Sequence, residues 1–329
     1  MGDRRIAIVT GGSGYIGGFL ISELLGSGGF EEIINFDLVE RDFGSHRVTF
    51  RRVDVRQPIA ERVERVDGDR SWIFHLAALA REPGSERREY FDTNVGGAET
   101  VTAYAAETGI RNLFFTSSMS TFGRMEDPTP EAASQYPETP YGISKLVAEK
   151  IHETWLAADP NRRLIVCRPA VIFGPGDREN VPRMVGAVKR GYFVFPGDPS
   201  IIKAYGYVYG LMDSIRFVLQ RPERHIVFHY AEENCLPLRS MVAAIMTVTG
   251  KKARIVRLPQ RPLLMLAQVM SYVSGRLGRR TPVHPVRVRK VAFPTNLKPQ
   301  YLIDAGFEFR YPFEVALEHW KERDPDLFA

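Results

Sequence analysis

The sequence contains little cysteine and no long hydrophobic run. Only two of its 329 residues are cysteines, Cys167 and Cys235, and they fit neither a disulfide framework nor a metal site. We therefore expect a reducing, cytoplasmic environment and no bound metal. The first apolar segment has five residues, too few for the core of a secretory signal. No apolar stretch reaches the roughly 18 residues of a membrane-spanning helix. These absences argue against a secreted, disulfide-stabilised domain and against a membrane-spanning protein.

The chain also lacks a strong net charge, internal repeats and low-complexity tracts. The net charge is +5, and no recognised nucleic-acid-binding module accompanies it, so we expect no nucleic-acid partner. Basic residues nevertheless gather in the C-terminal third: Arg254, Arg257, Arg261, Arg276, Arg279, Arg280, Arg287, Arg289 and Lys290. We favour a solvated basic surface. The alternative is that one or two of these arginines bind an anionic substrate such as a diphosphate.

In the first half, short apolar segments alternate with segments of helical periodicity. The expected strands cover residues 6–10, 33–37, 48–53, 72–77, 113–117 and 164–168, and the expected helices cover 14–25, 92–108 and 141–157. Near-continuous apolar strands that alternate with helices indicate an α/β fold with a doubly wound parallel Rossmann sheet.

The pattern changes after Pro169, where glycine and proline become frequent and the regular alternation ends. We expect a dinucleotide-binding Rossmann domain over residues 1–170 and a smaller mixed α/β substrate domain over 171–329. The two are expected to interleave. Residues 226–230 again resemble a strand, so part of 201–232 should return to the Rossmann sheet.

A glycine-rich loop follows the first expected strand and opens the first expected helix. Gly11, Gly14 and Gly17 would allow a tight turn, a close approach to a pyrophosphate and close packing of helix on strand. The helix N-terminus adds amide donors and a partial positive charge for the phosphates. The loop, including Tyr15 and Ile16, is therefore expected to bind a nicotinamide dinucleotide.

Asp37 lies 20 residues after Gly17, at the end of the second expected strand. A carboxylate there would accept hydrogen bonds from the adenosine ribose and repel a 2′-phosphate, which favours NAD over NADP.

Tyr141 and Lys145 lie four residues apart, on one face of an expected helix. A free phenol has a pKa near ~10 and is a poor base at neutral pH. An adjacent ammonium and a positive nicotinamide ring would favour the phenolate. Upstream, the strand ending near Phe115 runs into a serine-rich loop at the sheet edge where ligands of doubly wound folds bind. A hydroxyl of this loop could hold the oxygen that Tyr141 protonates or deprotonates.

Together, these residues resemble the extended short-chain dehydrogenase/reductase family, which includes the nucleotide-sugar epimerases and dehydratases. The resemblance covers nearly the whole chain and is most specific in the first ~180 residues. Thr10–Gly17 matches the TGGxGYIG motif, His75–Ala78 the HLAA motif, Ser117–Gly123 the SSxxxYG loop, Tyr141–Lys145 the YxxxK motif and Arg168–Asp177 the RPxxxxGPGD segment. Asn94 matches the family's helix asparagine.

The resemblance implies specific roles. It implies Ser118, Tyr141 and Lys145 as catalytic residues. It implies the following NAD contacts: Gly11, Gly14, Tyr15, Ile16, Gly17, Asp37, Asp54, Val55, Leu76, Ala77, Ala78, Tyr141, Lys145, Pro169 and Val171. It implies the following substrate contacts: Ser118, Ser120, Asn180, Lys203 and Arg289. It also implies a homodimer that forms through the helices bearing Asn94 and Tyr141.

Residues 203–210 depart from the family pattern Arg-Asp-Tyr-x-x-Val-Asp-Asp. Lys203 stands where the family has an arginine that contacts a nucleotide phosphate, and it cannot form the same two-pronged contact. The acidic pair is missing, which leaves the identity of the substrate open. Arg287 or Arg289 falls near the family's late diphosphate-binding arginine.

The residues after Ser118 limit the reaction. Family members that remove water carry Asp-Glu there, whereas this chain has Met119 and Ser120, and methionine transfers no protons. Ser120 also stands where some epimerases have a catalytic cysteine. Simple hydride chemistry at one carbinol remains, and we favour C4 epimerisation of a UDP-sugar. The alternatives are an NAD-dependent dehydrogenase or ketoreductase, on a nucleotide sugar or on a sterol- or flavonoid-like alcohol, and a cofactor-sensing protein without turnover.

The apolar segment 263–273, followed by Arg276, Arg279 and Arg280, lies outside the family pattern. We favour a helix packed on the substrate domain or covering the site. The alternative is a basic, apolar helix that contacts a membrane surface and serves a lipid-linked or hydrophobic substrate.

Overall fold

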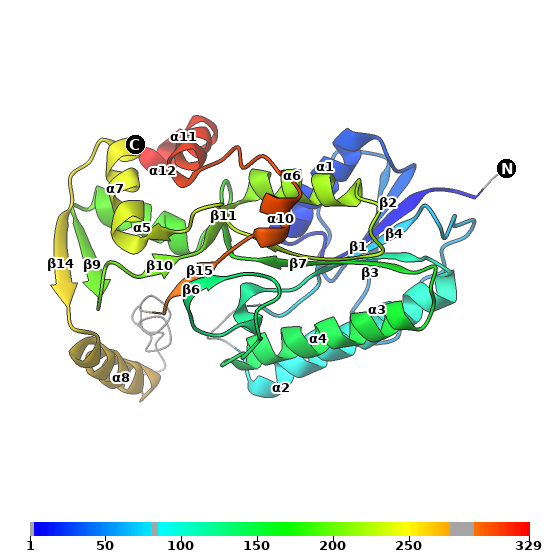
Figure 1. Cartoon of the computed structure of the whole chain (residues 1–329), viewed down its shortest axis with the longest axis horizontal. Helices are drawn as coiled ribbons and strands as arrows, with labels where there is room; N and C mark the ends of the chain where they lie inside the picture. Colours follow the sequence, from blue (N-terminus) through cyan, green and yellow to red (C-terminus); the bar gives the residue numbers. More distant parts are fainter. Residues whose placement is uncertain (1–2, 81–84, 277–292) are drawn as a thin grey trace.

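A seven-stranded parallel sheet forms the centre of the molecule (Figure 1). The structure is a computed structural model that describes residues 3–80, 85–276 and 293–329. The strand order is β12-β7-β5-β4-β1-β2-β3. The strands are β1 (Ile6–Thr10), β2 (Glu32–Asp37), β3 (Val48–Arg52), β4 (Trp72–His75), β5 (Asn112–Thr116), β7 (Arg163–Pro169) and β12 (His225–Tyr230). The chain runs outward from β1 to β3, returns to β4 and continues in the opposite direction. This reversal confirms the expected doubly wound sheet.

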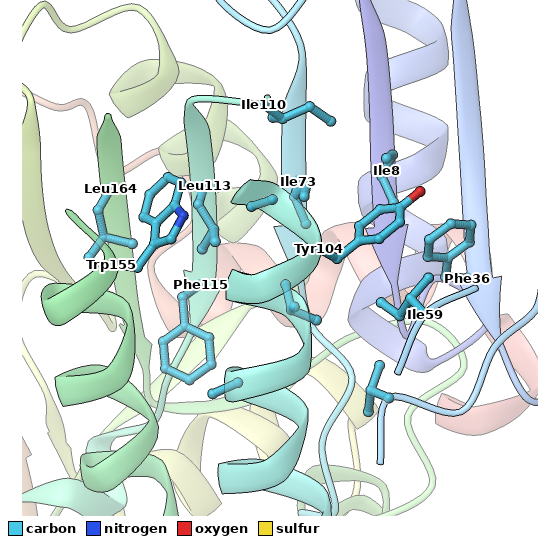
Figure 2. Close-up of a cluster of buried hydrophobic side chains, with 14 of the residues drawn as sticks. Ile8, Phe36, Ile59, Ile73, Tyr104, Ile110, Leu113, Phe115, Trp155 and Leu164 are labelled. Carbon is cyan, nitrogen blue, oxygen red and sulfur yellow. The ribbon is translucent and has the colours of Figure 1, made fainter. Parts of the chain in front are cut away.

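Both faces of the sheet are covered, which explains why its strands are apolar throughout. On β1, Ile6 and Ile8 point to one face, and Ala7 and Val9 point to the other. The first face carries α3 (Gly96–Thr108) and α4 (Pro140–Ala157), and Figure 2 shows the buried side chains between them and the sheet. The second face carries α1 (Tyr15–Ser27) and α6 (Val208–Leu219).

The helix expected over residues 92–108 is interrupted. The structure has a short helix α2 (Arg87–Tyr90), a π-helical turn η1 (Phe91–Val95) and then α3. A π-helical turn holds one more residue per hydrogen-bonded loop than an α-helix, so it shifts the direction of the side chains around it. Asn94 lies in this turn and points inward, where it is buried.

Most of the C-terminal half, together with β6 from the first half of the chain, forms a smaller mixed domain beside the carboxyl ends of the large sheet (Figure 1). Its four-stranded sheet has the order β13-β10-β15-β6, and two strand pairs, β11-β8 and β14-β9, complete it. These strands are β6 (Met125–Thr129), β8 (Val171–Phe173), β9 (Tyr192–Pro196), β10 (Ile202–Lys203), β11 (Tyr205–Tyr207), β13 (Leu236–Pro237), β14 (Arg254–Leu258) and β15 (Thr295–Leu297). The helices of this domain are α5 (Asn180–Lys189), α7 (Leu238–Thr249), α8 (Gln260–Arg276), α11 (Phe313–Arg323) and α12 (Pro325–Phe328). Helix α10 (Gln300–Asp304) instead packs against β12 at the edge of the large sheet.

This half has its own aromatic core, in which Phe173, Tyr207, Phe313 and Trp320 are buried together. Strand β12 lies within this part of the sequence but joins the edge of the large sheet, beside β7. Within the described ranges, no helix is long and apolar enough to cross a membrane.

Candidate active site

The glycine-rich loop between β1 and α1 forms a cradle that larger residues could not occupy. Gly11 has φ +75°, and a Cβ there would lie 2.7 Å from the backbone nitrogen of Ala77. A Cβ at Gly17 would lie 2.2 Å from the carbonyl oxygen of Gly11. These positions therefore need glycine for the turn itself and for the packing of α1 against β1. The amino end of α1, at Tyr15, opens directly from this cradle.

Asp37 occupies the end of β2, next to the cradle. Its Oδ2 accepts a hydrogen bond from the backbone amide of Ser13 at 3.0 Å, and its Oδ1 accepts bonds from the amides of Leu38 and Val39 at 2.7 and 3.2 Å. Three backbone donors therefore hold the carboxylate in place. It is partly exposed and lines the cavity, where its remaining lone pairs can accept the hydroxyls of a ribose.

A cavity of about 1090 Å³ extends along the carboxyl ends of β1, β2, β4 and β5. This is the edge at which doubly wound folds bind ligands. The lining residues among those predicted are Gly11, Gly14, Tyr15, Ile16, Gly17, Asp37, Asp54, Val55, Leu76, Ala77, Ala78, Ser118, Tyr141, Lys145 and Pro169. Residues from seven separate segments of the sequence therefore meet in one cavity, whose glycine cradle and helix N-terminus fit the pyrophosphate of a dinucleotide.

Ser118 begins a short 3₁₀ turn, η2 (Met119–Thr121), directly after β5. Its Oγ accepts a hydrogen bond from the backbone amide of Ser120 at 3.1 Å. The hydroxyl is thereby fixed with its oxygen toward the backbone, and its proton remains able to donate to an oxygen in the cavity. Ser118 is buried, and Ser120 does not line the cavity.

Tyr141 and Lys145 both lie in the first half of α4. Thr139 caps this helix by accepting a hydrogen bond from the amide of Gly142 at 3.1 Å, and Pro140 occupies the first helical position. Both features fix the start of the helix, and with it the Tyr141 ring at the cavity edge. The four-residue spacing then places Lys145 one turn further on the same face.

Lys145 is 1% exposed, and its ammonium lies 4.2 Å from the centre of the Phe115 ring. Phe115 in turn stacks on His152, with 4.1 Å between the ring centres, so the lysine packs against the first of two stacked aromatic rings. Burial lowers the pKa of Lys145 to about 7, against the opposing effect of the Glu149 carboxylate. Lys145 is therefore held desolvated at the cavity wall.

Asn94 connects the helix of Tyr141 to the loop that follows β4. Its Oδ1 accepts a hydrogen bond from the amide of Leu79 at 2.8 Å, and its Nδ2 donates to the Leu79 carbonyl at 3.1 Å. The same Nδ2 donates to Ser144 Oγ at 2.9 Å, and Ser144 in turn donates to the Tyr141 carbonyl at 2.8 Å. One buried amide thus fixes the distance between α4 and a loop that lines the cavity.

A buried ion pair supports the serine loop from behind. Arg168 donates to both carboxylate oxygens of Glu149, the shortest contact being 2.7 Å, and the two side chains are 5% and 0% exposed. Ser117 Oγ also donates to Glu149. The residue before Ser118 is therefore held by a fully paired carboxylate, which fixes the start of the serine-rich loop.

The sequence analysis did not identify several lining residues, among them Arg41 and Arg56. Arg56 forms a bidentate contact with Asp54, and this contact lowers the pKa of the Asp54 carboxyl. Arg41 lies 3.4 Å from the Gly14 carbonyl oxygen. Each follows a predicted site residue by two to four positions, so proximity in the sequence was the available clue.

Val171 is not among the residues that line the cavity. Its neighbours Ala170 and Ile172 line it, whereas Val171 packs against the aromatic core of the C-terminal half. The reason is the two-residue period of strand β8, which directs successive side chains to opposite sides.

The predicted substrate residues are more dispersed. Asn180 lies exposed at the start of α5, away from the cavity lining, and Arg289 lies outside the described residues. Lys203 is buried, and its Nζ donates to the Phe293 carbonyl at 2.6 Å. It borders a second, much smaller cavity together with Glu232, whose carboxyl pKa burial raises to about 8.

The fold and the cavity define a class of enzyme, the Rossmann-type oxidoreductases and epimerases that bind a nicotinamide dinucleotide beside a tyrosine and a lysine. The chain belongs to the NAD dependent epimerase/dehydratase family, whose model matches residues 7–229. It is an NAD-dependent epimerase of the extended short-chain dehydrogenase/reductase type, as the resemblance predicted.

Two curated relatives illustrate the match. The chain is 29% identical over 249 residues to the N-acetyl-alpha-D-glucosaminyl-diphospho-ditrans,octacis-undecaprenol 4-epimerase of Escherichia coli O157:H7, covering 75% of each chain. It is 25% identical over 287 residues to a UDP-glucose 4-epimerase of Streptomyces lividans, covering 77% of this chain and 84% of the relative. The solved UDP-glucuronic acid 4-epimerase of Bacillus cereus has the same fold, with a TM-score of 0.75 at 15% identity over 98% of this chain and all of that one.

Proposed function

We propose that this enzyme inverts C4 of a hexose whose C1 is esterified to a diphosphate, the arrangement found in UDP-sugars. The observation that carries the proposal is the convergence of Ser118, Tyr141 and Lys145 on one wall of the dinucleotide cavity. The two curated relatives described above are named as 4-epimerases. UDP-sugars are the natural first substrates to assay.

In this proposal Tyr141 removes the proton from the C4 hydroxyl and later returns it. Lys145 stabilises the phenolate through its positive charge, and Ser118 donates a hydrogen bond to the same sugar oxygen. The glycine cradle and Asp37 would hold NAD, and the chemistry that the bound cofactor would supply is reversible acceptance of the C4 hydride. Because the sugar is returned to the alcohol on its opposite face, no net oxidation occurs and no proton donor beyond Tyr141 is needed.

The residues beside Ser118 favour this reaction over elimination of water. Elimination needs a second acid–base pair next to the ketone. Met119 has no proton to transfer, and its side chain packs against the apolar cluster around Phe122 and Met125. The nearby buried carboxylate, Glu149, is fully paired with Arg168 and is not available as a base.

The decisive experiment follows both the sugar and the cofactor. The purified enzyme is incubated with UDP-glucose or UDP-N-acetylglucosamine in D₂O, and the products are identified by NMR. We expect the C4 epimer, with its C4 hydrogen retained, and no accumulation of NADH. Accumulation of NADH in step with product would instead identify a dehydrogenase and contradict the proposal.

Tyr141→Phe removes only the hydroxyl that transfers the proton. We expect turnover to fall by about 10²–10⁴-fold, the usual contribution of general acid–base catalysis, with the Kd for NAD changed little. Tyr136→Phe is a matched control, because Tyr136 is 73% exposed and does not line the cavity. An active Tyr141→Phe enzyme would refute the proposed role of this residue.

We further propose that the enzyme is a cytoplasmic homodimer that pairs through α3 and α4. The two helices pack side by side, and Val147 on α4 is 38% exposed. Size-exclusion chromatography with light scattering tests this: Val147→Glu should shift a dimer toward monomer, and a wild-type monomer would contradict it.

A further inference from the structure

One surface of the C-terminal half combines exposed apolar side chains with basic ones. It consists of β9, β14 and α8, at the end of the molecule opposite the N-terminus (Figure 1). We call it the β14–α8 surface and define it by these residues: Tyr192, Lys251, Lys252, Arg254, Leu258, Arg261, Met265 and Val269. None of them lines the dinucleotide cavity.

Exposed apolar side chains concentrate on this surface. Ten large hydrophobic residues are exposed among the described residues, and four of them lie here: Tyr192, Leu258, Met265 and Val269. Met265 and Val269 are 67% and 60% exposed. They lie one turn apart on α8, in line with Arg261 one turn earlier, so they form a stripe along one face. Within the described part of the chain, α8 packs extensively against no other helix or strand.

The strand pair beside α8 shows the same mixture. Tyr192 pairs with Arg254, and the alternation of the strands places Val256 and Leu258 on the same face as this pair. The opposite face of β9 carries Phe193 and Phe195, which are buried in the aromatic core. The face with Tyr192 and Leu258, 48% and 39% exposed, is thus the outer one.

Charge is strongly segregated here. Residues 234–276 contain seven lysines and arginines and no aspartate or glutamate. The whole chain has 39 acidic residues in 329, so a stretch of this length would ordinarily hold about five. The exposed Asp198 lies outside this stretch and interacts with Arg257 and Arg239. A solvated surface usually carries both signs evenly, whereas a predominantly basic surface with an apolar stripe is complementary to an anionic, partly apolar partner.

We propose that the β14–α8 surface docks on a membrane containing anionic lipids, and that the sugar diphosphate reaching the site is carried on a lipid. The lipid head groups pair with the arginines while Met265, Val269 and Leu258 enter the interface. The substrate part of the inference rests on the proposed function. A relative that matches 75% of the chain is named for a substrate of this class, an undecaprenol diphosphate sugar.

Vesicle co-sedimentation tests the surface without any turnover. The full-length enzyme is mixed with phosphatidylcholine vesicles, or with vesicles that also contain about 30% phosphatidylglycerol, which supplies the negative surface potential. We expect binding to the second kind only, weakened when salt is raised to about 0.5 M. Absence of binding to anionic vesicles would overturn the proposal.

Two double variants measure the electrostatic and the apolar contributions to vesicle binding separately. Arg254→Gln with Arg261→Gln should weaken binding by about fivefold per residue, since a basic side chain near such a surface contributes about 1 kcal/mol. Met265→Ser with Val269→Ser should weaken it at least tenfold. Arg62→Gln with Val315→Ser, exposed residues on other surfaces, is the matched control. Equal binding by all of these proteins would refute the β14–α8 surface.

A second assay tests the substrate. The wild-type enzyme is given N-acetylglucosamine linked to a polyprenyl diphosphate in anionic vesicles, or UDP-N-acetylglucosamine in solution. We expect faster turnover of the lipid-linked sugar, and the Met265/Val269 variant should lose this advantage while keeping its rate on the soluble sugar. Turnover of the soluble sugar alone would overturn the inference and leave the proposed function intact. Turnover of neither would overturn the proposed function, whatever the vesicles show.

Discussion

Replacing Lys145 by methionine should make the protein more stable while it abolishes catalysis. The ammonium is buried at the cavity wall, and its desolvation lowers the pKa to about 7. In the unfolded chain a lysine has a pKa near ~10.4. At neutral pH the folded state must therefore either hold a desolvated charge or release a proton, and both lower its stability. Methionine fills the same space without a charge.

The size and the pH dependence follow from the two pKa values. Between pH 7 and about 10 the unfolded state binds more protons at this site than the folded state, so stability rises with pH. The destabilisation by Lys145 is complete below pH 7 and is lost as the pH approaches 10. Methionine should raise the free energy of unfolding by about 3–5 kcal/mol at pH 6.5, but by only about 1–2 kcal/mol at pH 9.5.

Urea unfolding of the nucleotide-free protein at the two pH values measures this difference. Lys150→Met is the matched control, because Lys150 lies on the same helix, is 59% exposed and pairs with Glu153 at the surface. It should change stability by less than about 1 kcal/mol at either pH. A Lys145→Met protein that is less stable than the wild type, or a gain that does not shrink at high pH, would refute the reasoning.

Three further substitutions test other parts of the site. Gly17→Ala would bring its Cβ within 2.2 Å of the Gly11 carbonyl oxygen, so calorimetric titration should show loss of NAD binding. Gly26→Ala, later in α1, meets no atom within 4 Å and should be neutral or stabilising by up to about 1 kcal/mol. Asp37→Asn should raise the Kd for NAD about tenfold. It should also reduce the preference for NAD over NADP, because it removes the charge that repels a 2′-phosphate. An unchanged ratio of the Kd values for NAD and NADP would contradict this. Glu149→Ala leaves Arg168 buried without its partner and should reduce the free energy of unfolding, measured in urea, by about 3–5 kcal/mol. Glu149→Gln should reduce it less. A loss below about 1 kcal/mol for Glu149→Ala would show that the pair does not support the loop.

The sequence predicted the sheet and most of the cavity because both depend on local patterns. The apolar strands of a covered parallel sheet are continuous, so Ile6–Thr10 and its counterparts could be found directly. The glycine positions follow from the close approach of two backbones, which any other residue would block. The Tyr141–Lys145 spacing follows from the helical repeat.

Other features depend on contacts between distant segments. Asn94 bonds to residues 15 positions before it and 50 positions after it, and the π-helical turn that directs it leaves no pattern in the sequence. The position of Val171 depended on the phase of a three-residue strand, which sequence periodicity alone does not fix. The ion pair joins Glu149 on α4 to Arg168 on β7, 19 residues later in the sequence.

The buried charges near the active site differ in whether other groups of the protein pair with them, and this difference distinguishes a structural role from a catalytic one. Arg168 and Glu149 satisfy each other, and Ser117 adds a further hydrogen bond, so that this pair is complete within the protein. Lys145 instead faces the cavity over an aromatic ring, and burial lowers its pKa. A buried charge that the protein does not fully compensate lowers stability, and such a residue persists where a bound group completes its environment. By this argument the Glu149–Arg168 pair holds the serine loop in place, whereas the charge of Lys145 is compensated only when a ligand binds in the cavity.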